Sequence, residues 1–152
     1  MTYLKDALES EHYRAEIHTE GQKTITFTEA DTDYQITDVV DGITQGFTLT
    51  GGTLTFVGEQ ETAFLFAGAC DARVSSVGCS VNIVTFKLVL NGELVPECST
   101  EVEYINTGRI RNFSCAQPLK IDFGDDVDVF ARSTVAGTVM TITSFTTALW
   151  GR

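Results

Sequence analysis

The fold class follows from one stretch near the C-terminus, Leu119-Lys-Ile-Asp-Phe-Gly-Asp-Asp-Val-Asp-Val-Phe-Ala131. Every second residue from Leu119 to Phe123 is apolar, and the alternation resumes at Val127 after a Gly124-Asp125-Asp126 turn. A period of two on both sides of a Gly/Asp turn predicts two half-buried antiparallel strands. We therefore expect an all-β domain, and we see no catalytic motif in this stretch.

The chain before this stretch continues the pattern with short segments at the spacing of a sandwich or barrel. Between Thr62 and Cys70, Phe64 and Phe66 lie on one face and small or aliphatic residues on the other. Asn91-Gly92 predicts a tight hairpin, because both residues tolerate the positive φ of a type I′ turn. No helical run follows residue 20, which favours an antiparallel all-β fold.

The N-terminal region is the one place where the sequence allows a helix. Within residues 2–16, apolar Tyr3, Leu4 and Leu8 would share one helical face. Polar residues then weaken this stripe, so a short helix and a loose arm are both compatible with the sequence.

A Gly-rich region from Asp41 to Gly52 follows, and we interpret it as a junction. The predicted organisation is an N-terminal arm over residues 1–45, for anchoring or oligomer contact, and a main domain over residues 46–152. The acidic residues are concentrated in the arm, which indicates either a solvated segment or one that docks on a basic partner.

The chain of 152 residues has a formal net charge of −11. Such a charge repels phosphate backbones and anionic bilayers, so we expect no nucleic-acid binding. No apolar run reaches the length of a transmembrane helix, and the first ten residues do not resemble a signal peptide. We expect no membrane insertion and synthesis in the cytoplasm.

The four cysteines lack the paired knuckles of a zinc site. Four cysteines allow three pairings, and Cys70 with Cys79 would close a short loop. Cytosolic synthesis favours free, mostly buried thiols at Cys70, Cys79, Cys98 and Cys115.

No enzymatic site is predicted, and no metal or cofactor. His12 and His18 both lie in the arm, so residues 47–152 contain no histidine for a metal centre or a nucleophile pair. The carboxylates from Asp122 to Asp128 are explained by turn chemistry and solvation rather than by calcium. Arg109 and Arg111 form the main local basic spot, either as ion-pair partners or as a docking point.

These strands and turns resemble the trimeric jelly rolls of the tumour-necrosis-factor and complement-globular-head type. The pieces that carry the resemblance are the segments 64–70 and 81–90, the Asn91-Gly92 turn, Leu119 to Val129, and the closing strand 138–149. Relatives of this fold recur in bacteriophage head fibres, capsid decoration proteins and tail-fibre tips. The chain has Phe64-Leu-Phe-Ala-Gly68 in place of the Gly-x-Tyr opening of many animal members, which favours a viral relative over a cytokine.

The resemblance implies an antiparallel jelly-roll sandwich with a short N-terminal arm, assembled as a homotrimer through one apolar sheet face. Aromatic residues are enriched in interface cores. The predicted interface residues are Phe64, Phe66, Phe145, Leu149 and Trp150.

The expected function is that of a virion structural protein, located in the virion after synthesis in the host cytoplasm. As a capsid decoration protein or head fibre, it would bind the major capsid or another virion protein through Tyr3, Leu4 and Leu8 of its arm. The alternative is a receptor- or carbohydrate-binding tip of a tail fibre, with a host-surface glycan as a candidate partner. Its specificity would come from the loops 71–79, 106–112 and 132–138.

Overall fold

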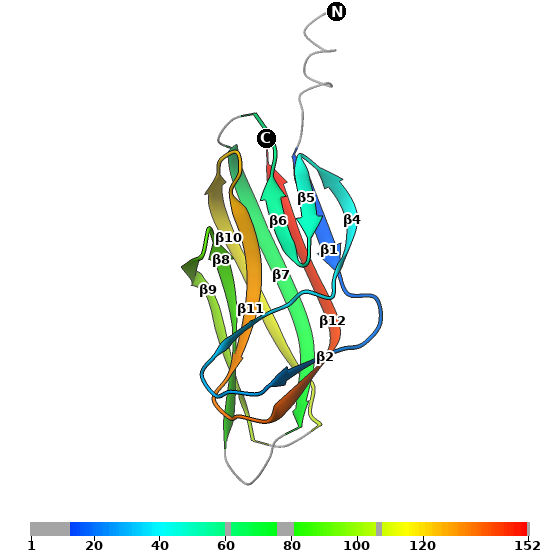
Figure 1. The fold of residues 1–152 in the computed structure, drawn as a ribbon, viewed down its shortest axis with the longest axis vertical. Coiled ribbons are helices and arrows are strands. Elements are labelled where there is room, and N and C mark those ends of the chain that lie inside the picture. The colour runs from blue at the N-terminus through cyan, green and yellow to red at the C-terminus, as the bar shows by residue number, and fades with distance from the viewer. Residues whose placement is uncertain (1–12, 60–61, 76–80, 106–107, 152) are drawn as a thin grey trace, which may run out of the picture.

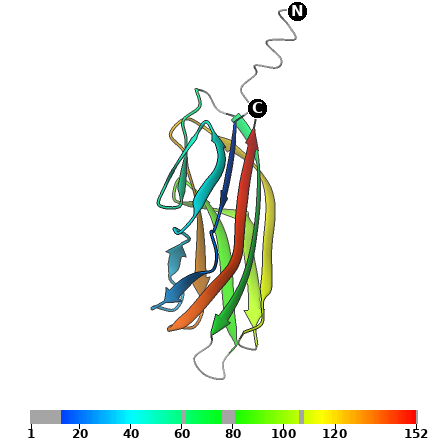
Figure 2. The ribbon, with the colours of Figure 1, turned by 90° about the vertical axis from the view of Figure 1, so that its right-hand side faces the viewer.

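Two antiparallel β-sheets pack face to face in the computed structural model, which describes residues 13–59, 62–75, 81–105 and 108–151 (Figure 1). The two layers are separate in the side view (Figure 2). These residues form twelve strands. No helix among them is long and apolar enough to cross a membrane. The predicted all-β antiparallel sandwich is confirmed.

Six strands form the first sheet, which we call sheet A, and every pairing in it is antiparallel. Its order is β10 (Arg111–Ile121), β7 (Thr62–Ser75), β12 (Thr138–Gly151), β1 (Arg14–His18) and β4 (Val40–Gln45), with β2 (Lys23–Phe27) pairing the other part of β12.

The second sheet, sheet B, also has six strands and lies opposite sheet A. Its order is β5 (Phe47–Thr50), β6 (Thr53–Phe56), β11 (Asp126–Ser133), β8 (Asn82–Leu90) and β9 (Glu93–Tyr104), with β3 (Asp33–Gln35) also pairing β11.

Both predicted tight turns are present. Gly124 has a φ of +85° between the end of β10 and the start of β11, and Asn91 and Gly92 have φ values of +52° and +78°. Positive φ at both hairpin residues is what a type I′ turn requires. The predicted alternation fails at Phe123, which lies outside the strand and is 66% exposed, whereas Ile121 is fully buried.

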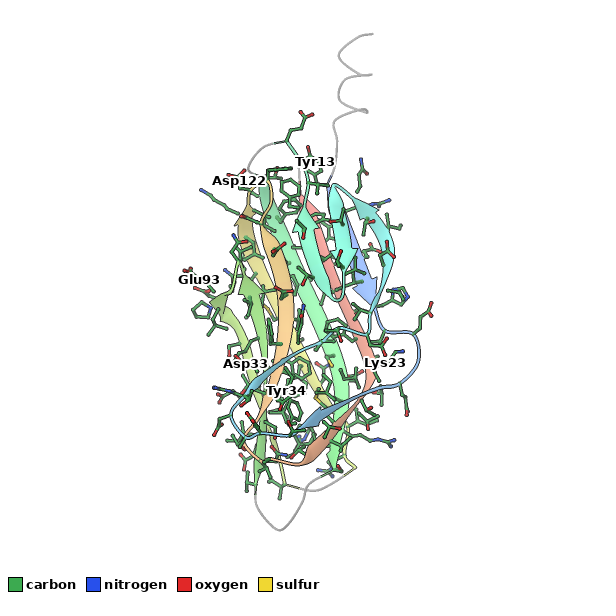
Figure 3. All side chains as sticks on the ribbon, viewed as in Figure 1. Tyr13, Lys23, Asp33, Tyr34, Glu93 and Asp122 are labelled. Carbon is green, nitrogen blue, oxygen red and sulfur yellow. A yellow bond between two sulfur atoms is a disulfide. The ribbon has the colours of Figure 1, made fainter. Side chains whose placement is uncertain are left out.

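Aromatic rings fill the core at the end of the sandwich where Tyr13 lies (Figure 3). Phe56 contacts Tyr13, Phe47 and Phe64 edge-on or tilted, with ring centroids 5.0–5.2 Å apart. Such geometries add to the free energy gained from burial alone. These rings come from four strand regions of both sheets, so they hold the two layers together at this end.

A buried polar cluster joins the sheets towards the opposite end. The side-chain amide of Asn82 in β8 donates to the Thr138 hydroxyl of β12 at 2.8 Å. Its oxygen accepts a hydrogen bond from the Ser133 hydroxyl of β11 at 2.9 Å. Because both polar ends of the buried amide have partners, this cluster fixes how the sheets align without an unsatisfied group.

The predicted boundary at residue 46 is wrong, because residues 14–45 are part of the sandwich. β1 lies between β12 and β4, with Ala15 and Ile17 buried in the core at 0% and 4% exposure. Its alternation of apolar and polar residues is that of a half-buried strand, so residues 14–16 do not continue a helix. Tyr3, Leu4 and Leu8 of the predicted anchor lie outside the described residues.

If β1 is a core strand, Ile17→Ala lowers the free energy of unfolding by about 2–5 kcal/mol, as expected for a buried isoleucine. The matched change Arg14→Ala removes an exposed side chain from the same strand and alters stability by less than about 0.5 kcal/mol. Urea unfolding at one protein concentration measures both. Equal, small effects would show that β1 is a peripheral arm after all.

Candidate interaction surfaces

Four of the five residues predicted to form a subunit interface belong to the core of the single chain. Phe64, Phe66 and Phe145 are each 3% exposed, and Leu149 is 1% exposed. The prediction is corrected for these four, because strand alternation turns their side chains between the two sheets, away from any second copy. Trp150 is 46% exposed and lies on the outer face of sheet A.

The outer face of sheet A presents small and apolar side chains at its centre. Strand register places Trp150 beside Leu65 and Ala148 beside Ala67, and β10 continues the same rows on the far side of β7. We call this surface the small-residue face; it comprises Leu65, Ala67, Ala69, Ser114, Ala116, Thr146, Ala148 and Trp150. The alternation in β7 predicted that its outer face is apolar. Which residues of β12 and β10 lie beside it could be seen only from the strand register.

A groove of about 550 Å³ crosses the small-residue face. Glu16 and His18 of β1 line one side and Ala67 to Ala69 of β7 the other, with β12 between them. The register of β12 shifts between Ile142 and Ser144, and this β-bulge lies at the groove. A bulge bends its strand and redirects side chains out of the regular pleat, so the bulge in β12 helps to form the groove. His12 lies outside the described residues.

The outer face of sheet B has a different character, because charged side chains cover it. The Asp33 carboxylate lies 3.0 Å from Lys87 Nζ and 3.4 Å from Arg132 Nε, and this ion-pair network ties β3 to β8 and β11. Glu101 and Glu103 of β9 are exposed on the same face. Charged residues are depleted in interface cores, so the centre of the sheet A face is closer in composition to a buried interface than the sheet B face is.

The aspartates around the Gly124 turn serve the local structure. Asp125 Oδ2 accepts a hydrogen bond from the Asp122 backbone N–H at 2.8 Å. Asp126 and Asp128 accept theirs from side chains of β6 and β3. Among the described residues, no group of three or more His, Cys, Asp or Glu side chains is placed to hold a metal ion.

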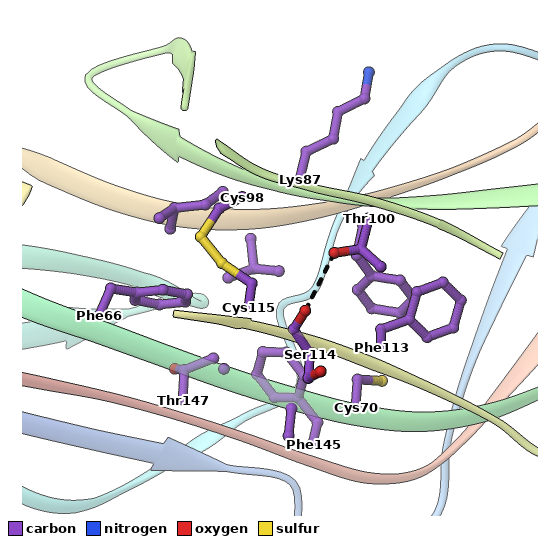
Figure 4. Close-up of a pocket in the computed structure, with 15 residues that line it drawn as sticks. Phe66, Cys70, Lys87, Cys98, Thr100, Phe113, Ser114, Cys115, Phe145 and Thr147 are labelled. Atoms are coloured by element: carbon purple, nitrogen blue, oxygen red, sulfur yellow. Dashed lines mark hydrogen bonds between the residues drawn. A yellow bond between two sulfur atoms is a disulfide. The ribbon is translucent and has the colours of Figure 1, made fainter. Parts of the chain in front are cut away.

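Cys98 and Cys115 form a disulfide, which corrects the expectation of four free thiols (Figure 4). Their Cα atoms are 5.5 Å apart, within the usual range for a disulfide. The bond joins β9, at the edge of sheet B, to β10, at the edge of sheet A. The sequence could not reveal this pairing, because it depends on two edge strands of different sheets meeting. Cys79 lies outside the described residues.

Cys70 is a free, buried thiol beside a small, partly open cavity. Burial raises its pKa to about 12, with a smaller contribution from the Asp71 carboxylate, so the thiol is protonated and unreactive at neutral pH. Phe66, Phe113 and Phe145 line the cavity, whose volume of about 40 Å³ is far below what a benzene-sized ligand needs (Figure 4). The cavity is a packing gap.

The basic spot predicted from sequence lies at the end of the sandwich opposite Tyr13. Arg109 is exposed and Arg111 is half-buried where β10 begins. Within the described part of the chain, neither has an ion-pair partner, so the predicted ion-pair role has no support there. Exposed Ile105 and Ile110, at 70% and 54%, lie next to them in sequence.

Comparison with solved structures identifies the fold. No family model matches the sequence, and no curated protein matches it. The structure is similar to Eiger TNF from S. frugiperda, with a TM-score of 0.62, 13% identity, and 93% of each chain covered. It is also similar to murine APRIL at pH 5.0, with a TM-score of 0.51, 8% identity, and coverage of 88% of this chain and 99% of that chain.

The class of protein is therefore an all-β jelly roll. More particularly, it has the tumour-necrosis-factor-like form of that fold, as the resemblance in sequence pattern implied.

We expect the disulfide to contribute about 3 kcal/mol of stability, because it closes a loop of 17 residues. The double change Cys98→Ser and Cys115→Ser should therefore lower the unfolding temperature, and dithiothreitol should lower that of the wild type similarly. Cys70→Ala serves as the control, since it leaves this sensitivity to reductant in place. Wild-type protein with the same unfolding temperature in oxidant and in reductant would contradict the prediction.

Proposed function

We propose that this protein is a homotrimeric virion structural protein, a capsid decoration protein or head fibre, that self-assembles through the small-residue face. The observation that carries the assembly step is the contrast between the two outer faces. In a chain of net charge −11, the outward positions of β7 from Leu65 to Ala69 and of β12 from Thr146 to Trp150 carry no charged side chain, whereas the Asp33 ion pairs lie on the other face.

The geometry of the small-residue face supports close contact between copies. Ala67, Ala69 and Ala148 leave the backbone open to approach, and Trp150 and Leu65 add apolar area at one end of the groove. A groove flanked by an exposed tryptophan favours a head-to-tail contact, in which one protomer fills the groove of the next. Such contacts close into a ring when the rotation between neighbouring copies closes, and the tumour-necrosis-factor-like fold supports a ring of three.

The position of the described chain ends supports attachment of the trimer to the particle through the end at which Tyr13 lies. Tyr13 and Gly151 are joined by a backbone hydrogen bond of 2.9 Å, so both described ends of the chain leave the sandwich together (Figure 1). The opposite end, with Ile105 and Ile110, would then point away from the particle. The Cys98–Cys115 disulfide suits a protein that works outside the reducing cytosol, as a released particle does.

A second function, a receptor-binding tip, is supported by one observation at that far end. Ile105 and Ile110 are exposed, and exposed Arg109 directly precedes Ile110, a combination suited to a protein receptor with acidic and apolar groups. The segments 71–79 and 132–138, which the sequence predicted to be loops but which include ends of β7, β11 and β12, contain no aromatic residue to stack on a sugar ring, so a protein receptor is favoured over a glycan. Particles that carry an Ile105→Ala/Ile110→Ala variant but no longer attach to host cells would favour this function.

The assembly proposal predicts that the wild-type protein has three times the chain mass of 16.6 kDa in solution. Ala69→Glu places a carboxylate in the groove and should give monomers, because burying an unpaired charge in an interface costs several kcal/mol. Light scattering coupled to size-exclusion chromatography at micromolar concentration measures the mass.

The matched control is Ser99→Glu, which adds the same charge at an exposed position of β9 in sheet B and should remain trimeric. A monomeric wild type would refute the assembly proposal. Dissociation by Ser99→Glu but not by Ala69→Glu would assign the interface to sheet B.

The virion proposal predicts that the protein copurifies with particles of its source and appears on their surface in averaged electron micrographs. Three-fold density with the Tyr13 end against the particle is the expected result. Particles that lack the protein, from cells in which the protein is made, would refute a virion role and leave the trimer intact.

A further inference from the structure

Phe123 is the most exposed aromatic residue in the described part of the chain, at 66%. Strand alternation would have placed it in the core, but the turn at Gly124 removes it from β10 and directs it outward. Val57, at 45% exposure, follows the strand on which this turn packs. Single exposed apolar residues are common on proteins, so exposure alone does not make Phe123 a binding residue.

What distinguishes Phe123 is the rigidity of the turn that carries it. The Asp125 backbone N–H donates to the Asp122 carbonyl at 3.0 Å, and the Phe123 N–H donates to the Asp122 carboxylate at 2.8 Å. Gly124 donates to the carbonyl of Phe56 in β6 at 2.8 Å, and Phe56 donates back to Asp125 at 3.0 Å. The turn is thus hydrogen-bonded within itself and to the neighbouring sheet.

A second turn braces the first. The Asn91 side chain donates to Asp125 Oδ1 at 2.7 Å and accepts from the Asp126 backbone N–H at 2.8 Å. The backbone N–H of Asn91 also donates to the Asp126 carbonyl at 2.9 Å. Because the backbone that carries Phe123 is already ordered, binding through its ring adds little backbone entropy cost, which favours its use as an interface anchor.

The location and charge of this turn indicate what it binds. Figure 3 shows Asp122 at the same end of the sandwich as Tyr13, where the described chain ends leave the fold. Asp122 and Asp125 lie on either side of Phe123 in the sequence, and Lys120 at the end of β10 is the nearest cation in sequence. A second copy of this acidic end would be repelled, so the complementary partner is a surface with basic groups around an apolar pocket.

We propose that Phe123 is an anchor that inserts into an apolar pocket, rimmed by Lys or Arg side chains, on the particle protein to which this chain attaches. The inference rests on the proposed virion function and names its contact. The negative charge of Asp122 and Asp125 complements the basic rim, and the hydrogen-bonded turn fixes the backbone that carries the ring.

The test measures binding of the trimer to source particles assembled without this protein, by sedimentation over a range of concentrations. Phe123→Ala should weaken binding on the order of 30-fold, the loss typical of an aromatic anchor. Phe123→Trp should retain most of the wild-type affinity. Raising the salt from 50 to 300 mM should weaken wild-type binding, because salt screens the attraction between the acidic turn and the basic rim. Val81→Ala, at the opposite end, is the matched control and should bind as the wild type does.

The outcomes separate this inference from the function on which it rests. If the wild type binds particles and Phe123→Ala binds them equally well, the role of Phe123 as an anchor is rejected and the virion role is retained. A wild type that does not bind particles overturns both. Because the side chain is mostly exposed, Phe123→Ala should keep the wild-type unfolding temperature and trimer mass, so that a loss of binding reports on the contact.

Discussion

The pairing of β7 with β12 is the constraint on which the rest of the structure depends. It runs from Val139 opposite Ser75 to Gly151 opposite Phe64, between segments more than sixty residues apart in sequence. Because side chains alternate along both strands, this one register fixes at once which residues fill the core and which form the outer face. β1, β2 and β10 then add to the edges of this pair, and sheet B covers its inner side.

The sequence predicted those features that short-range chemistry determines. The turns at Asn91-Gly92 and Gly124 follow from residues that tolerate positive φ, and alternation correctly placed Phe64 and Phe66 on one face of their strand. That this face is the inner one was not predicted, because both residues were assigned to a subunit interface. The misassigned elements depend on contacts distant in sequence. β1 is only five residues long, so its pattern was too short to outweigh an apparent N-terminal helix, and only its place between β12 and β4 identifies it as a strand.

The predicted interface failed for a related reason. Large apolar residues at Phe145 and Leu149 indicated burial correctly, but burial within a chain and burial between chains have the same signature in sequence. The candidate interface became visible from the small residues opposite them, Ala148 and Ala67, which only the register brings together. The bulge near Ser144 adds a hollow to this face, and an extra residue inserted in one strand is not apparent without its partner strand.

At Phe123, the hydrogen bonds of a turn override strand alternation and leave an aromatic side chain exposed. Asp122 to Asp125 close their own hydrogen-bonded turn, so the pleat that buries Ile121 stops before it reaches Phe123. Any polar side chain would satisfy that position, since the backbone hydrogen bonds there do not involve the ring. Folding therefore does not require a phenylalanine at this site, and the described residues leave 66% of its side chain exposed. A rigid, acidic turn that exposes an aromatic ring is better explained by a contact that the single chain does not supply.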